Sequence, residues 1–155
     1  MKKYVLLSLC LVLLLALGSC GSSGSEDNGN EADMQEFPSF TGLDLDGNSV
    51  NSDIFSENSV TVVNFWFSSC SPCIGELSEL DSLNQELKEK GGAVIGINTD
   101  TLNGDNSMIE EAKKILMQQK ASYRNLYFDS NSGDAMDFAN SITSFPTTYL
   151  VDRGG

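Results

Sequence analysis

Two apolar runs in the middle of the chain have the composition of buried β-strands. Residues 60–67 form a continuous stretch of β-branched and aromatic side chains, and residues 93–98 form a second, shorter one. Such runs are typical of strands that are covered on both faces. Between them, large aliphatic residues recur every three or four positions and predict an amphipathic helix that ends at a Gly-Gly pair. These residues are Ile74, Leu77, Leu80, Leu83 and Leu87.

Weaker patterns on either side continue the alternation of strands and helices. They predict a β-hairpin at 40–50, a helical turn at 52–55, a helix at 108–120, a short strand at 126–128, a short helix at 133–139 and a strand at 147–151. Strands that alternate with helices favour an α/β domain whose sheet is parallel at its centre. No internal repeat is visible in the sequence.

The first 36 residues have a different character. Lys2 and Lys3 precede an apolar run at 5–17, which is shorter than the about 20 residues of a spanning helix, and small residues follow it. This is the pattern of a signal peptide, residues 1–19. The residues that end in Cys20 resemble a bacterial lipobox, in which this cysteine is lipidated after cleavage; an ordinary signal peptide with an incidental cysteine is the alternative. Residues 20–36, rich in Gly, Ser and acidic side chains, predict a flexible tether, and residues 37–155 predict one folded domain.

Composition narrows the possible functions. The 155 residues include 22 acidic, 9 basic and no histidine side chains, for a net charge of −13. Without histidine there is no imidazole base and no mixed Cys/His metal site. The negative charge argues against a nucleic-acid partner, because such binding depends on Lys and Arg side chains that neutralise phosphates.

We predict the reactive site at Cys70-Ser71-Pro72-Cys73, where the strand at 60–67 ends and a helix begins. A thiolate at a helix N-terminus lies near free backbone N–H groups and the positive end of the helix dipole. In such motifs the pKa of the first cysteine falls from about 8.5 to about 3.5–7.5. Cys73, about one turn further on, can then resolve a mixed disulfide formed at Cys70. Pro72 suits the first helical turn, where no N–H is needed.

Two other uses of the cysteine pair compete with this interpretation. A structural disulfide between residues three apart constrains little of the unfolded chain, worth about 2 kcal/mol. A metal site needs about four ligands, and neither Cys10 in the signal peptide nor lipidated Cys20 can supply one. We therefore expect a redox-active disulfide between Cys70 and Cys73, with no metal and no other cofactor.

Taken together, these motifs resemble the thioredoxin fold and, more narrowly, the TlpA/ResA-like thiol-disulfide oxidoreductases, which are bacterial, membrane-anchored and extracytoplasmic. The resemblance covers residues 37–155 and implies a central mixed sheet flanked by helices, with an N-terminal β-hairpin. It is carried by Val63-Asn64-Phe65-Trp66 before the cysteines, by Glu76 three residues after Cys73, and by Phe145-Pro146-Thr147-Thr148 before an apolar strand and Asp152.

The resemblance implies a function and a set of site residues. The substrates would be protein thiols or disulfides, apocytochrome cysteines among them, and the protein would have a membrane thiol-redox partner. Cys70 and Cys73 would be catalytic, and Glu76 either relays the proton of the buried cysteine or is an ordinary solvated carboxylate. The Phe145-Pro146 peptide would be cis and would seat the substrate together with Thr147. Trp66 would pack under the active-site turn and would be a substrate-binding residue together with Phe145, Pro146 and Thr147.

The sequence departs from the family at several positions. Asn64 stands where cytoplasmic thioredoxins carry a buried aspartate, and Ser69 replaces a frequent Trp. The edge strand and closing helix that follow the last strand in the family have no counterpart before Gly155, so we expect a domain that is incomplete at its C-terminus. A non-catalytic binding lipoprotein remains an alternative. A thiol peroxidase is a weaker one, because Phe67 occupies a position where peroxiredoxins carry Thr or Ser. The direction of electron flow stays open.

Overall fold

The computed structural model describes residues 35–155. The predicted signal peptide, the lipidation site Cys20 and nearly all of the predicted tether lie outside the described residues. Within the part of the chain that is described, no helix is both long and apolar enough to cross a bilayer.

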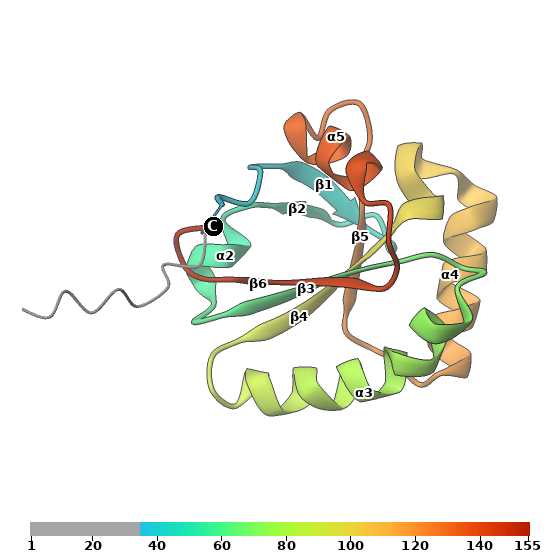
Figure 1. The fold of residues 1–155 in the computed structure, drawn as a ribbon, viewed down its shortest axis with the longest axis horizontal. Helices are drawn as coiled ribbons and strands as arrows, with labels where there is room; N and C mark the ends of the chain where they lie inside the picture. Colours follow the sequence, from blue (N-terminus) through green and yellow to red (C-terminus); the bar gives the residue numbers. More distant parts are fainter. Residues whose placement is uncertain (1–34) are drawn as a thin grey trace, which may run out of the picture. The chain divides into compact units, whose positions relative to one another are not determined.

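A six-stranded mixed sheet forms the centre of the domain (Figure 1). Its order is β2-β1-β5-β4-β3-β6. β3, β4 and β5 are parallel, whereas β1 runs antiparallel to β2 and β5, and β6 runs antiparallel to β3. The predicted thioredoxin-like α/β fold is therefore confirmed, including the N-terminal hairpin. The strands are β1 (Thr41–Asp44), β2 (Ser49–Asn51), β3 (Thr61–Trp66), β4 (Ala93–Asn98), β5 (Arg124–Tyr127) and β6 (Thr147–Val151).

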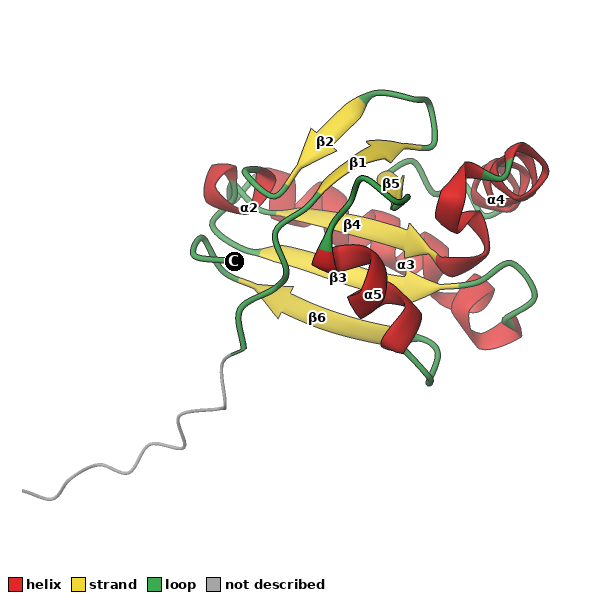
Figure 2. Cartoon of the chain, turned by 90° about the horizontal axis from the view of Figure 1, so that it is seen from above, coloured by secondary structure: helices red, strands yellow, loops and turns green. Residues whose placement is uncertain are grey.

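Helices cover both faces of this sheet (Figure 2). α3 (Ser71–Lys88) and α4 (Asn106–Gln118) pack on one face, and the short α5 (Asp134–Ser141) and α2 (Ile54–Glu57) pack on the other. A 3-10 segment, η1 (Thr99–Gly104), links β4 to α4.

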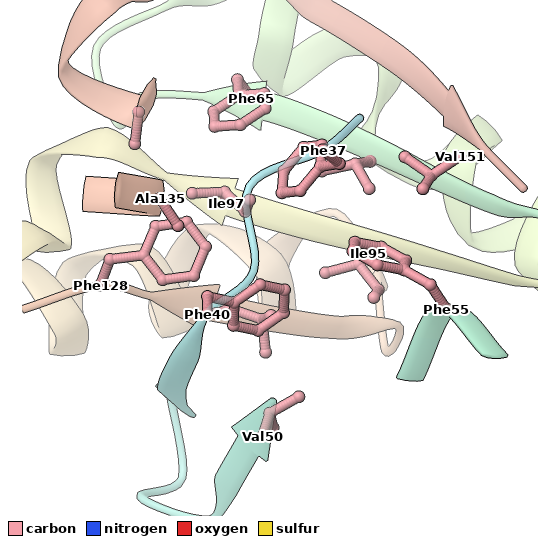
Figure 3. Close-up of a cluster of buried hydrophobic side chains, with 13 residues drawn as sticks. Phe37, Phe40, Val50, Phe55, Phe65, Ile95, Ile97, Phe128, Ala135 and Val151 are labelled. Atoms are coloured by element: carbon pink, nitrogen blue, oxygen red, sulfur yellow. The ribbon is translucent and has the colours of Figure 1, made fainter. Parts of the chain in front are cut away.

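The core on the α5 side is aromatic (Figure 3). Phe37, which immediately follows the predicted tether, lies with its ring 5.2 Å from the rings of both Phe55 and Phe138 and stacks on Phe65. Such edge-to-face and offset contacts add to the stabilisation that apolar burial provides. This layer supports the back of β3, the strand that leads into the cysteine motif.

The buried face of α3 differs from the predicted leucine stripe. Its fully buried positions are Cys73, Leu77 and Asn84, whereas Leu83 is 37% exposed. Asn84 is buried because its side-chain oxygen accepts the N–H of Val94 at 3.0 Å, which ties the helix to β4. The helix is therefore oriented by the cysteine motif and by this hydrogen bond as much as by its leucines.

Candidate active site

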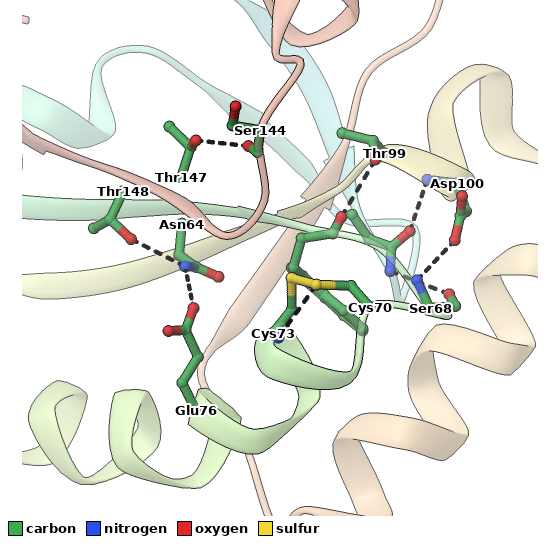
Figure 4. Close-up of a disulfide and its surroundings, with 12 residues drawn as sticks. Asn64, Ser68, Cys70, Cys73, Glu76, Thr99, Asp100, Ser144, Thr147 and Thr148 are labelled. Carbon is green, nitrogen blue, oxygen red and sulfur yellow. Dashed lines mark hydrogen bonds between the residues drawn. A yellow bond between two sulfur atoms is a disulfide. The ribbon is translucent and has the colours of Figure 1, made fainter.

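Cys70 and Cys73 form a disulfide where β3 gives way to α3 (Figure 4). Cys70 is the N-cap of α3, and its sulfur accepts the backbone N–H of Cys73 at 3.2 Å. Pro72 lies in the first turn of the helix, where the backbone needs no donor. The predicted position of the first sulfur over free N–H groups is thus observed.

The two cysteines differ in their surroundings. Cys70 is 5% exposed and borders the exposed residues Ser69 and Ser71, whereas Cys73 is completely buried beneath the first turn of α3. Of the two cysteines, only Cys70 therefore has any surface open to a substrate thiol.

Residues that follow β4 hold the segment before Cys70. The N–H of Ser68 donates to a carboxylate oxygen of Asp100 at 2.7 Å, and the Thr99 hydroxyl donates to the carbonyl of Trp66. Asn98 completes the link, because its side chain contacts both Ser68 and the N–H of Asp100. Two segments about thirty residues apart thus fix the path of the chain into the disulfide.

Trp66 lies fully buried beneath the turn and offers no ring surface to solvent. Its Nε1–H donates to the side-chain oxygen of Asn125 at 2.8 Å, and the Asn125 amide donates to the carbonyl of Tyr123. Asn125 reaches Trp66 by passing over Gly96, its neighbour in the sheet register. The sequence-based role for Trp66 under the turn fits this geometry, whereas direct contact with a substrate does not.

Glu76 is half-buried and lies against the sheet, not on a solvated helix face. One of its carboxylate oxygens accepts the Asn64 Nδ2–H at 2.9 Å, and the same amide donates to the Thr148 hydroxyl at 3.1 Å. Asn64 itself is completely buried in β3. The hydrogen bond to Asn64 thus holds the carboxylate one helical turn from Cys73.

The loop before β6 completes the surface around the disulfide. The Phe145–Pro146 peptide is cis, as the resemblance implied. The Phe145 ring packs edge-on against Phe67, 5.0 Å between centroids, and both half-buried rings pack against the cluster that contains the two cysteines. The Thr147 hydroxyl donates to the carbonyl of Ser144 at 2.7 Å and so closes this loop.

Two titratable groups, Tyr123 packed beside α3 and Asp81 on α3 itself, have altered pKa values. Burial, together with the carboxylates of Glu76 and Asp81, raises the pKa of the Tyr123 phenol far above its usual value. Burial alone would raise the pKa of Asp81, but hydrogen bonds from Ser122 and the N–H of Tyr123 outweigh it and hold this pKa below 3.8. Asp81 therefore fastens α3 to the segment that enters β5.

Sequence reasoning missed three residues that support the site, Asn98, Asp100 and Asn125. Two of them, Asn98 and Asn125, are polar side chains at buried strand positions. A buried amide beside an apolar run is a signal for a structural hydrogen bond, because an unpaired one is costly. That signal does not reveal the partners that are distant in the sequence, Ser68 for Asn98 and Trp66 for Asn125.

This fold and this site define a thiol-disulfide oxidoreductase of the thioredoxin-like class: a disulfide at a helix N-terminus, a cis-proline loop beside it and a mixed sheet beneath. The chain belongs to the AhpC/TSA family, whose sequence model matches residues 34–155. Within that family it is ResA-like, as the following relatives indicate.

ResA, a thiol-disulfide oxidoreductase of Bacillus cereus, is 28% identical over 161 residues, which cover all of this chain and 86% of that protein. The thioredoxin domain of a thiol-disulfide oxidoreductase from Bacteroides vulgatus is 31% identical with a TM-score of 0.63, covering 78% of this chain and 81% of that one. A secreted thiol-disulfide isomerase from Corynebacterium glutamicum is 26% identical with a TM-score of 0.62, covering 81% and 74%.

Proposed function

We propose that this protein is a lipid-anchored, extracytoplasmic oxidoreductase that exchanges disulfides with protein substrates through the Cys-Ser-Pro-Cys pair. The observation that carries the proposal is the asymmetry of the pair: the sulfur of Cys70 caps α3 at the surface edge of the helix, while Cys73 is fully buried. Exchange requires one accessible sulfur that is stabilised as a thiolate and one sheltered sulfur that resolves the intermediate.

In the direction that oxidises a substrate dithiol, one substrate thiolate attacks the sulfur of Cys70. The bond between Cys70 and Cys73 breaks, Cys73 leaves as a thiolate and takes up a proton, and Cys70 is joined to the substrate. The second substrate thiolate then attacks the substrate sulfur of this mixed disulfide and releases Cys70 as a thiolate. Two electrons pass from the substrate to the pair, and the reverse sequence reduces a substrate disulfide.

We assign the remaining roles, proton exchange and substrate binding, to residues around the cysteine pair. Glu76 lies one turn from Cys73 on α3 and accepts a hydrogen bond from Asn64 at 2.9 Å, which supports assigning to it the exchange of the proton that Cys73 takes up and loses. Phe145, Pro146 and Thr147 form the half-buried loop against which a substrate segment would rest. Trp66 supports this surface from below.

Differential alkylation tests the roles of the two cysteines. In the reduced protein at pH 7, Cys70 should react with iodoacetamide much faster than Cys73, and its pKa should lie below about 8.5. Cys70→Ser should abolish insulin reduction, whereas Cys73→Ser should retain the fast thiol and accumulate a mixed disulfide with substrate. Equal alkylation rates, or unchanged turnover in Cys70→Ser, would leave a non-catalytic binding protein as the better description.

The proposed location and partners rest on the predicted signal peptide and on Cys20, both outside the described residues, with support from the secreted relative. A membrane thiol-redox partner would renew the pair, and substrates would include apocytochrome cysteines. Expression with labelled palmitate tests the anchor. Cys20→Ala should lose the label and accumulate as precursor, while Cys10→Ala, the matched control within the signal peptide, should keep it. A wild-type protein that is cleaved, unlabelled and free in the medium contradicts the anchor.

A further inference from the structure

The side chain of Asn64 is oriented by its two partners. Its Nδ2 group donates to a carboxylate oxygen of Glu76 at 2.9 Å and to the hydroxyl of Thr148 at 3.1 Å, so the amide nitrogen faces these two partners. The amide oxygen is consequently turned to the other side. Figure 4 shows this oxygen pointing away from Glu76 and Thr148, toward the side on which Cys73 lies.

This oxygen is a buried acceptor without a donor. Asn64 is completely buried, and no group in residues 35–155 donates a hydrogen bond to its Oδ1 in the oxidised protein. Buried polar side-chain atoms are nearly always paired. A disulfide sulfur carries no hydrogen, so Cys73, on the side toward which this oxygen points, cannot supply the missing donor while the pair is oxidised.

Reduction changes what Cys73 can do. When a substrate dithiol reduces the pair, the S–S bond breaks, two electrons pass to the pair, Cys73 takes up a proton, Cys70 is released as a thiolate, and the substrate leaves as a disulfide. Cys73, fully buried at the first turn of α3, then becomes a thiol with an S–H donor and no access to solvent. The oxidised structure thus leaves an unpaired acceptor that points toward the side of the sulfur that gains a hydrogen on reduction.

We propose that Asn64 is a positioning residue that accepts the hydrogen of the Cys73 thiol in the reduced protein, while its amide holds Glu76. One side chain then touches both groups between which the resolving proton moves. Because the hydrogen bond exists only in the dithiol form, it stabilises that form relative to the disulfide. The inference rests on the proposed exchange function and assigns Asn64 a part in setting its reduction potential.

Infrared spectroscopy of the S–H stretch tests the contact directly. In Cys70→Ser the Cys73 thiol remains, and subtracting the spectrum of Cys70→Ser/Cys73→Ser isolates its band from those of Cys10 and Cys20. We expect the band at lower wavenumber than that of a thiol in an apolar solvent, and a shift to higher wavenumber in Cys70→Ser/Asn64→Leu. A band at the free-thiol position in Cys70→Ser overturns the proposal. This outcome can be observed even if the Asn64→Leu variants do not fold. An unshifted band in a folded Asn64→Leu protein, as expected if an internal water serves Asn64, also overturns it.

The reduction potential supplies a second readout. Asn64→Leu removes the acceptor at similar volume and should shift the equilibrium toward the disulfide by about three- to tenfold, which lowers the potential by about 14–30 mV. Thr148→Val is the matched control, because it removes a partner of the amide nitrogen and leaves the oxygen free; its potential should stay within about 5 mV of the wild type, well under a twofold change. A Thr148→Val shift as large as that of Asn64→Leu would overturn the proposal.

These measurements separate this inference from the proposed function. If Cys70 is alkylated faster than Cys73 and exchange occurs, but neither the S–H band nor the potential responds to Asn64→Leu, only the role of Asn64 is wrong. If the cysteines show no difference in reactivity and no exchange, the proposed function fails, whatever the infrared band reports.

Discussion

Gly96→Ala is the smallest substitution that should disturb the support of the redox turn. Gly96 lies in β4 directly between Asn64 of β3 and Asn125 of β5. A Cβ atom at this position would lie 2.6 Å from the amide carbon of Asn125 and would overlap its side-chain oxygen. That oxygen accepts the Trp66 Nε1–H, so the added methyl group must displace the acceptor on which the buried indole depends.

The magnitude follows from two costs. Inserting a methyl group into a packed core costs about 1–3 kcal/mol, and leaving a buried donor such as the Trp66 Nε1–H unpaired costs about 1–3 kcal/mol. We expect Gly96→Ala to lower the free energy of unfolding by about 2–6 kcal/mol, a large part of the about 5–15 kcal/mol of a typical domain. Gly75→Ala, a control in α3 whose Cβ would meet nothing within 4 Å, should instead stabilise by about 0.5–1 kcal/mol.

A double-mutant cycle assigns the cost to Asn125. Urea unfolding of the wild type, Gly96→Ala, Asn125→Ala and the double variant gives the four free energies. In the Asn125→Ala background the obstacle is gone, so Gly96→Ala should cost less than about 1 kcal/mol, and the two substitutions should couple by at least about 1 kcal/mol. An equal cost of Gly96→Ala in both backgrounds would show that the clash with Asn125 is not what makes glycine necessary.

Three further predictions concern the packing around the site. Asp81→Asn should lower the free energy of unfolding by about 1–3 kcal/mol at pH 7. Because folding lowers the pKa of Asp81, the difference in stability between wild type and variant should shrink as pH falls below 3.8. Urea unfolding at a series of acidic pH values measures this. At pH 7, Tyr123→Phe should leave the free energy of unfolding unchanged or raise it by up to about 1 kcal/mol. Since folding raises the pKa of this phenol, the variant should also lose less stability than the wild type above pH 10. Phe65→Ala should cost about 3–5 kcal/mol in thermal or urea unfolding.

The local patterns of the sequence were sufficient to predict most of the elements. The apolar run at 60–67 is the strand β3, and the predicted final strand at 147–151 has the same bounds as β6. The prediction of β3 succeeds because a strand buried on both faces needs apolar side chains at successive positions. β6 lies at the edge of the sheet and is mostly exposed, so its prediction succeeds through its β-branched and aromatic composition instead. The cysteine motif was equally recognisable, since a helix N-terminus and its cap are also local features.

Other properties depended on segments that meet only in the folded chain. Nothing near Glu76 in the sequence distinguishes it from Glu79 as a solvated carboxylate, and only the packing of α3 on β3 brings it to Asn64. Leu83 continues the leucine spacing yet is 37% exposed, because the position of the helix is decided by Cys73 and Asn84. Periodicity describes one helix, whereas burial depends on what is packed against it.

Trp66 shows most clearly which properties the sequence determined and which depended on the folded chain. The sequence determined that an indole follows a buried strand and precedes the cysteines, so that a place under the turn could be predicted. That its donor is satisfied by Asn125, across a glycine on the strand between them, was decided by the register of β3, β4 and β5. Such register is set by long-range pairing and by shape, because a side chain can cross a neighbouring strand only where that strand has no Cβ in the way.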